Sequence, residues 1–196
     1  MPAQVTRQYI DEESLLNDSY RLAAKVYQSG FRPDFIVGIW RGGSTVGIYV
    51  QECLQYLGQE TDHIAIRTSY RGMEDYFKRQ QQPEQIRVHG LQYLYENLNR
   101  DDALLIVDDV FASGRSVQAV IDRLALKAKR NMPTDTRVAT PYFKPARNET
   151  DRIPDYYLHA TDDWLVLPYE LTGLTLDELR EHKPWIVPIL EPHLKR

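Results

Sequence analysis

The chain has 196 residues, 42% hydrophobic and 27% charged, a length and balance that predict one globular domain with a single core. Its 24 basic and 28 acidic side chains leave a net charge of −4, which argues against a broad nucleic-acid surface. Cys53 is the one cysteine and excludes an internal disulfide, while no apolar run has the length of a membrane span or the form of a signal peptide. We therefore expect a cytoplasmic protein that binds neither nucleic acid nor membranes, with Cys53 in a helix core.

The hydrophobic pattern predicts helices that alternate with short apolar strands. Helices are expected over 11–30, 45–58, 91–99 and 116–130, and strands over 34–40, 63–70, 103–110 and 137–143. Strands separated by helices pair in parallel through crossover connections. The predicted fold class is therefore α/β, with a parallel twisted sheet flanked by helices.

Two regions fall outside this alternation. Residues 71–87 are polar, Gln-rich and without period, which is typical of a long excursion loop that acts as a lid or is disordered. Residues 150–196 add strands over 156–160 and 164–170 and a helix over 176–183. We interpret the whole chain, 1–196, as one domain with a core at about 10–145 and a small C-terminal hood at about 146–196.

The stretch "LLIVDDVFASGRSV", residues 104–117, carries the strongest functional signal. Asp108 and Asp109 end a buried strand, and ligands of open parallel sheets bind beyond the carboxyl ends of the strands. Carboxylates there accept hydrogen bonds from sugar hydroxyls or hold Mg²⁺. The small residues 112–116 lead into a helix, whose N-terminal amides favour a phosphate. The pattern predicts a ribose 5-phosphate site; the alternative is a plain strand-turn-helix with an N-cap serine and surface acids.

This stretch resembles the signature of the type I phosphoribosyltransferases: an apolar strand, two acids, a short gap, and Ser/Thr-Gly-x-Ser/Thr. The resemblance implies that Asp108 and Asp109 bind the ribose hydroxyls of phosphoribosyl diphosphate (PRPP) and Mg²⁺. It implies that the 5-phosphate is held by Ala112, Ser113, Gly114, Arg115 and Ser116.

Two further segments resemble the 6-oxopurine branch of that family, which salvages hypoxanthine, guanine or xanthine. "IWRGGS" matches the loop that binds the diphosphate leaving group, which implies a cis peptide between Trp40 and Arg41 and a loop formed by Arg41, Gly42 and Gly43. The alternative is an ordinary strand-to-helix turn. "TSYRG" matches the start of the flexible active-site loop at Ser69 and Tyr70.

A third segment resembles the base-binding part of that branch. By resemblance, Lys144 donates to the purine 6-oxo oxygen, Trp164 stacks on the base and Leu165 offers its backbone. Glu170, six positions after Trp164, approaches the Mg²⁺-diphosphate. A buried core aromatic at Trp164 and a solvated strand end at Lys144 are the alternatives.

One position departs from the family pattern. The residue before Ser-Gly is usually an aspartate that acts as general acid/base near the purine N7, and here it is Ala112. A methyl group cannot transfer a proton, so Glu74 and Asp75 in the 71–87 segment are candidates to replace it, with Asp109 as a less favoured one.

The resemblance thus implies a magnesium-dependent, homodimeric purine phosphoribosyltransferase that forms nucleotide and diphosphate from PRPP and a base. Two alternatives stay open. One is a regulatory protein that binds PRPP without turnover, which Ala112 favours. The other is a phosphoribosyltransferase for a non-purine acceptor.

Overall fold

A mostly parallel sheet dominates the computed structural model, which describes residues 7–69 and 86–194. Within those ranges the strand order is β4 (Arg87–His89), β3 (Asp62–Ser69), β2 (Phe35–Trp40), β5 (Ala103–Val107), β7 (Asp135–Phe143) and β6 (Val110–Phe111), and β8 (Tyr156–Ala160) pairs with β7. The β3–β4 pair is antiparallel, and the other pairs of this sheet are parallel. The predicted α/β fold class is confirmed.

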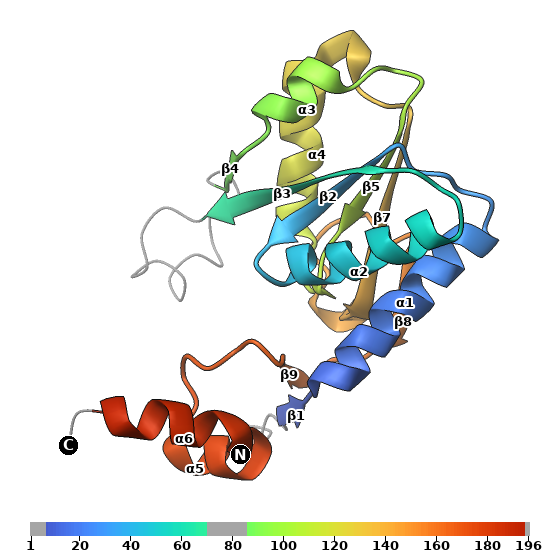
Figure 1. Ribbon diagram of the computed structural model, residues 1–196. Helices are drawn as coiled ribbons and strands as arrows, with labels where there is room; N and C mark the ends of the chain where they lie inside the picture. Colours follow the sequence, from blue (N-terminus) through green and yellow to red (C-terminus); the bar gives the residue numbers. More distant parts are fainter. Residues whose placement is uncertain (1–6, 70–85, 195–196) are drawn as a thin grey trace. The chain divides into compact units, whose positions relative to one another are not determined.

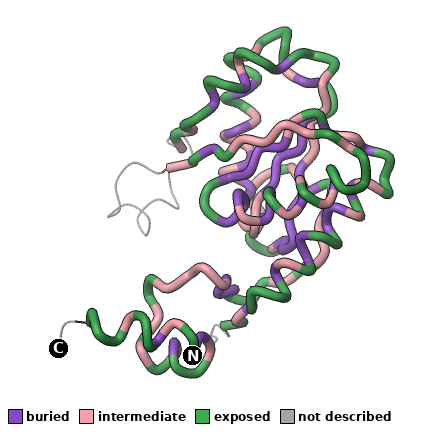
Figure 2. The backbone as a smooth tube through the Cα atoms, viewed as in Figure 1, coloured by how far each residue is buried: buried purple, intermediate pink, exposed green. Residues whose placement is uncertain are grey.

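Helices cover both faces of this sheet (Figure 1). They are α1 (Glu12–Gln28), α2 (Gly42–Tyr56), α3 (Gln92–Asn97) and α4 (Arg115–Ala128). The apolar sides of α3 and α4 pack with one face of β2, β3, β5 and β7 in a single buried cluster. Buried residues follow the central strands in Figure 2, because β2 and β5 are covered on both faces. Short 3-10 helices follow at Lys129–Asn131 and Pro145–Arg147.

The structure corrects several local predictions. Helix α2 begins at Gly42, three residues before the predicted start, so Gly42 and Gly43 belong to its first turn. Strand β4 was missed, because the sequence near its start looked like the end of the long loop. Cys53 is half-buried on α2 and not a core residue; burial still raises the pKa of its thiol.

The described residues divide into two compact units, one of residues 13–162 and one that joins residues up to 12 with residues from 163 onward. The smaller unit contains β1 (Arg7–Tyr9) parallel to β9 (Trp164–Val166), followed by α5 (Leu176–His182) and α6 (Val187–Leu190). Two 3-10 helices flank α6, at Pro184–Ile186 and Glu191–His193. Strand β8, placed in the predicted hood, belongs to the main sheet; the single-domain boundary stays a prediction. Among the described residues, no helix combines the length and apolar character needed to cross a bilayer.

Candidate active site

The two acids of the signature lie where β5 ends, at the carboxyl edge of the sheet. The Asp108 N–H donates to the Ala139 carbonyl of β7 (3.1 Å), and the Thr140 hydroxyl donates to the Asp109 carbonyl (3.1 Å). Each carboxylate accepts from the next amide: Asp108 Oδ1 from Asp109 N–H (3.1 Å) and Asp109 Oδ1 from Val110 N–H (2.9 Å). These bonds fix the backbone and the orientation of both carboxylates.

Asp108 is half-buried at this edge of the sheet. Burial, and then the neighbouring charge of Asp109, raise the pKa of the Asp108 carboxyl well above its ordinary value. A cation or a hydroxyl donor beside the pair would relieve this cost. The pair of acids is therefore suited to a positively charged or hydrogen-bonding ligand.

The residues present fit a magnesium ion that is shared with a ligand. Among the described residues, no group of three or more His, Cys, Asp or Glu side chains is placed to hold a metal ion. Mg²⁺ commonly takes only one or two protein carboxylates and completes its octahedron with water and substrate phosphate oxygens. Asp108 and Asp109 could supply these one or two carboxylate ligands.

The raised pKa of Asp108 leads to a stability prediction. Because the folded chain binds this proton more tightly than the unfolded chain, stability falls as pH rises from the ordinary carboxyl pKa toward the raised one. We expect Asp108→Asn to raise the Tm of the ligand-free protein by roughly 2–4 °C at pH 8, and by less at pH 5. Thermal unfolding at both pH values, with the exposed Asp101→Asn as control, measures this. An equal gain at pH 5 and pH 8 would contradict it.

The phosphate loop follows β6 and ends in the first turn of α4. Gly114, the residue before the helix, has φ 73°, a conformation that L side chains rarely adopt. A Cβ there would also press on the Thr150 hydroxyl and lie 2.8 Å from Phe111 Cζ. The loop therefore requires glycine, and its compact form presents backbone amides at the amino end of a 14-residue helix.

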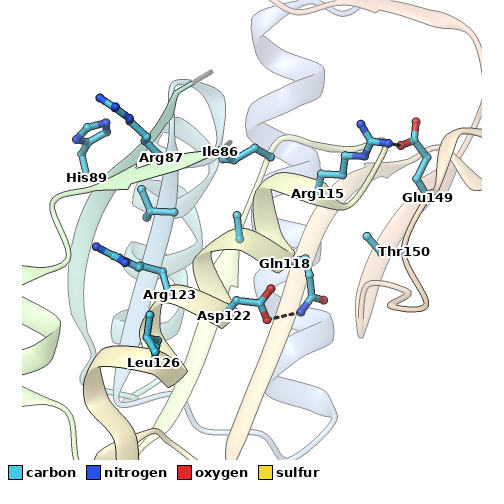
Figure 3. A pocket seen from close by; sticks show the side chains of 12 residues that line it. Ile86, Arg87, His89, Arg115, Gln118, Asp122, Arg123, Leu126, Glu149 and Thr150 are labelled. Atoms are coloured by element: carbon cyan, nitrogen blue, oxygen red, sulfur yellow. Dashed lines mark hydrogen bonds and ion pairs between the residues drawn. The ribbon is translucent and has the colours of Figure 1, made fainter. Parts of the chain in front are cut away.

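The Arg115 side chain reaches Glu149, whose backbone is bonded to the phosphate loop. Its guanidinium forms an ion pair with Glu149, as Figure 3 shows, and the Glu149 N–H donates to the Ser113 carbonyl (3.1 Å). The Arg115 N–H donates to the Ser113 hydroxyl within the loop (3.4 Å). Glu149 and Thr150 could not be predicted from the sequence, because nothing near the motif signals a partner about 35 positions later.

The loop after β2 meets the first acid directly. The Trp40–Arg41 peptide is cis, as the resemblance implied. Gly43 follows in the first turn of α2, and a Cβ there would lie 2.5 Å from the Val107 carbonyl oxygen and 2.8 Å from Asp108 Cα. This close approach brings the loop with Arg41 beside the end of β5.

Lys144 and Ser69 mark the carboxyl ends of two other strands. The Lys144 N–H donates to the Phe111 carbonyl (2.9 Å), so Lys144 follows β7 beside the start of the phosphate loop. Ser69 ends β3, and its hydroxyl lies 3.1 Å from His89 Nε2 on β4. Tyr70, Glu74 and Asp75 lie outside the described residues.

The remaining predicted residues belong to the smaller unit. Trp164 begins β9 and is 52% exposed, so the alternative of a buried core aromatic is wrong. Leu165 is buried beside it. One oxygen of the Glu170 carboxylate accepts from the Leu167 N–H (3.2 Å), which folds this acid onto its own turn.

A cavity of about 810 Å³ lies between β4 and the outer side of α4 (Figure 3). Arg115 and Glu149 lie at one end, and Gln118 donates to Asp122 in its middle (2.8 Å). Of the predicted site residues that lie within 7–69 and 86–194, only Arg115 lines it. The cavity is thus distinct from the edge that carries Asp108 and Asp109.

Comparison with known proteins shows the family of this chain. The sequence model of one protein family, the phosphoribosyl transferase domain, matches residues 6–172. The chain belongs to this family. Its resemblance to the type I phosphoribosyltransferases, first seen in residues 104–116, is thereby confirmed. No curated protein matches the chain.

Solved structures of low sequence identity share the fold of this family member. A purine phosphoribosyltransferase from Pyrococcus horikoshii is 23% identical, with a TM-score of 0.62 over 86% of this chain and 97% of that one. Xanthine-guanine-hypoxanthine phosphoribosyltransferase of Helicobacter pylori is 19% identical, with a TM-score of 0.64 over 90% and 100%. A hypothetical protein of Neisseria gonorrhoeae with bound ppGpp is 18% identical, with a TM-score of 0.66 over 93% and 98%.

Proposed function

We propose that this family member transfers the 5-phosphoribosyl group of PRPP to a purine base and releases diphosphate. The observation that carries the proposal is the meeting of three segments at one sheet edge. Gly43 brings the cis-peptide loop against Asp108, and β5 and β6 lead from Asp108 and Asp109 to the phosphate loop at Gly114. Purine phosphoribosyltransferases among the solved structures of this fold favour a purine acceptor.

Each segment has one task in the proposed reaction. Asp108 and Asp109 accept hydrogen bonds from the ribose 2- and 3-hydroxyls, and residues 112–116 bind the 5-phosphate. Magnesium, when bound with PRPP, offsets negative charge on the diphosphate. The bond from ribose C1 to the diphosphate oxygen breaks with its electron pair on the oxygen, while a base nitrogen donates the pair that forms the new bond to C1. Arg41 stabilises charge on the departing diphosphate.

The base-binding roles are carried over from the family. Lys144 donates to the 6-oxo oxygen, Trp164 stacks on the ring and Leu165 contributes its backbone. Glu170 approaches the magnesium-diphosphate after leaving the Leu167 amide. Ser69 and Tyr70 begin the loop that covers the reacting atoms, and the chain acts as a homodimer.

Proton transfer at the base needs a residue other than Ala112. General acid/base help is worth about 10²–10⁴ in rate, so a competent enzyme supplies it from elsewhere. We propose Glu74 or Asp75 for this role. The double variant Glu74→Gln with Asp75→Asn is expected to lower kcat by about 10²-fold and leave PRPP binding unchanged. Steady-state kinetics and PRPP titration of the same samples measure the two effects, and an unchanged kcat would exclude both residues.

A binding-only function is the second candidate. Ala112 favours it, and the Neisseria structure of the same fold holds ppGpp, a nucleotide with two diphosphates. A PRPP sensor would bind the donor without turning it over. A non-purine acceptor is the third possibility, and it would use the same PRPP-binding half.

The test is an acceptor panel. Purified protein with PRPP and Mg²⁺ is offered hypoxanthine, guanine, xanthine, adenine, uracil and orotate, and diphosphate release is followed for each. We expect release with at least one 6-oxopurine and little with uracil or orotate. Release with a pyrimidine alone would replace the purine assignment, and tight PRPP binding without release for any base would leave the sensor.

A further inference from the structure

A buried lysine organises the turn that follows the base-binding strand. Lys183 is 2% exposed, and its ammonium donates to three carbonyls of one turn: Leu167 (2.7 Å), Pro168 (2.6 Å) and Glu170 (2.9 Å). An ammonium has three N–H donors, so all three are used. The same turn is closed by Glu170 N–H to the Leu167 carbonyl (3.0 Å).

Burial disfavours the charged form of Lys183, and the carbonyl groups of the turn offset this loss of hydration. Burial lowers the pKa of the Lys183 ammonium, while the carboxylates of Glu170 and Glu12 act in the opposite direction. A buried ammonium is tolerated where carbonyl dipoles and nearby acids surround it. Removing the ammonium would leave three carbonyls of residues 167–170 without this donor, so the turn and the lysine depend on each other.

Helix α5 ties this lysine to the rest of the small unit. At its end, the Lys183 N–H donates to the Leu179 carbonyl (2.8 Å). At its start, Thr175 and Glu178 form a capping box, and Glu178 also binds Arg7 and accepts from the Tyr9 hydroxyl (3.1 Å) on β1. Because β1 pairs with β9, the helix is fastened to the strand on one side and to the turn after it on the other.

We propose that Lys183 is a positioning residue for base recognition. It holds the backbone of residues 164–170 in the form that presents Trp164 and Leu165, without touching the substrate itself. The inference rests on the proposed function, because those two residues are the ones assigned to the base. It extends the site to a lysine that lies 13 positions beyond Glu170, outside every motif.

The test compares Lys183→Met and Lys183→Gln with Arg180→Met in the full chain. Arg180 is an exposed cation on the same helix, paired with Asp177 and Glu191, so its variant matches the charge change without reaching the turn. Hydrogen exchange of peptides over 164–171 and the KM values for the base and for PRPP are measured. We expect Lys183→Met to speed exchange there and to raise the base KM, each about tenfold, with the PRPP KM changed less than about threefold.

Lys183→Gln, which keeps two donors, is expected to fall between the wild type and Lys183→Met, and it replaces Lys183→Met should that variant not fold. Arg180→Met should match the wild type in every readout. Unchanged exchange over 164–171, or parallel rises in both KM values, would overturn the positioning role. An inactive wild type would instead overturn the proposed function and, with it, the assignment to base recognition.

Discussion

Replacing both signature acids, Asp108→Asn with Asp109→Asn, is expected to lower nucleotide formation by roughly 10³-fold. The pair is fixed at the end of β5 by hydrogen bonds to backbone amides, and burial, followed by the neighbouring charge of Asp109, raises the pKa of the Asp108 carboxyl. Asparagine keeps the volume and one oxygen of each side chain but removes the charge that holds ribose hydroxyls and magnesium. Product formation under saturating PRPP and base measures the loss.

A matched control lies at the other end of the same strand. Asp101 and Asp102 are also adjacent acids, and they precede β5, at its amino end. The double variant Asp101→Asn with Asp102→Asn changes the same net charge and should keep activity within about threefold of the wild type, as for surface substitutions. Equal losses in the two double variants would mean that charge alone, and not its position, explains the effect.

Gly43→Ala is expected to lower kcat/KM for PRPP by about 10²-fold, because an added methyl pushes the diphosphate loop off the end of β5. The new Cβ would lie 2.5 Å from the Val107 carbonyl oxygen and 2.8 Å from Asp108 Cα, and both are backbone atoms, at the last residue of β5 and at the residue after it. The loop with Arg41 must therefore move. Kinetics at varied PRPP, together with thermal unfolding to show that the chain folds, measure this.

Gly47→Ala is the control for the same helix. Its Cβ would lie 2.9 Å from His63 Nε2, a side-chain atom, so the imidazole can shift while the backbone stays in place. Partial burial lowers the pKa of this imidazole. Its Nδ1 lies 3.2 Å from the Gln51 side-chain oxygen Oε1. We expect a small loss of stability and nearly normal kinetics. If the Gly43→Ala variant instead keeps the wild-type kcat/KM for PRPP, the contact between Gly43 and Asp108 does not set the position of the loop.

The parts of the site that could be predicted are those encoded in contiguous residues. The strand, acids and loop of residues 104–116 follow one another, so pattern and residue chemistry were enough to place them. Strand β2 was predicted for the same reason, and the cis peptide after it was implied by the family resemblance. The start of α2 at Gly42 was not predicted. Helix formation over Gly42 and Gly43 depends on packing against the end of β5, and intrinsic helix propensities do not include such packing.

The parts that could not be predicted depend on contacts between distant residues. Segments far apart in the sequence are brought together only by the fold. Examples are the ion pair of Arg115 with Glu149, the position of Thr150 beside Gly114, and the three hydrogen bonds donated by Lys183. The sequence places Lys183 at the end of a predicted short helix over 176–183 and indicates no role for it. Its burial is visible only when the turn at 167–170 is placed against it.

The proposed function requires that this chain transfers the phosphoribosyl group of PRPP and does not merely bind PRPP. The most direct measurement is mass-spectrometric quantification of nucleotide and diphosphate after PRPP, Mg²⁺ and hypoxanthine or guanine are incubated with the protein. We predict equal amounts of both products, dependent on the base and lost in the Asp108→Asn, Asp109→Asn variant. PRPP that is bound yet recovered intact with every base would contradict the account.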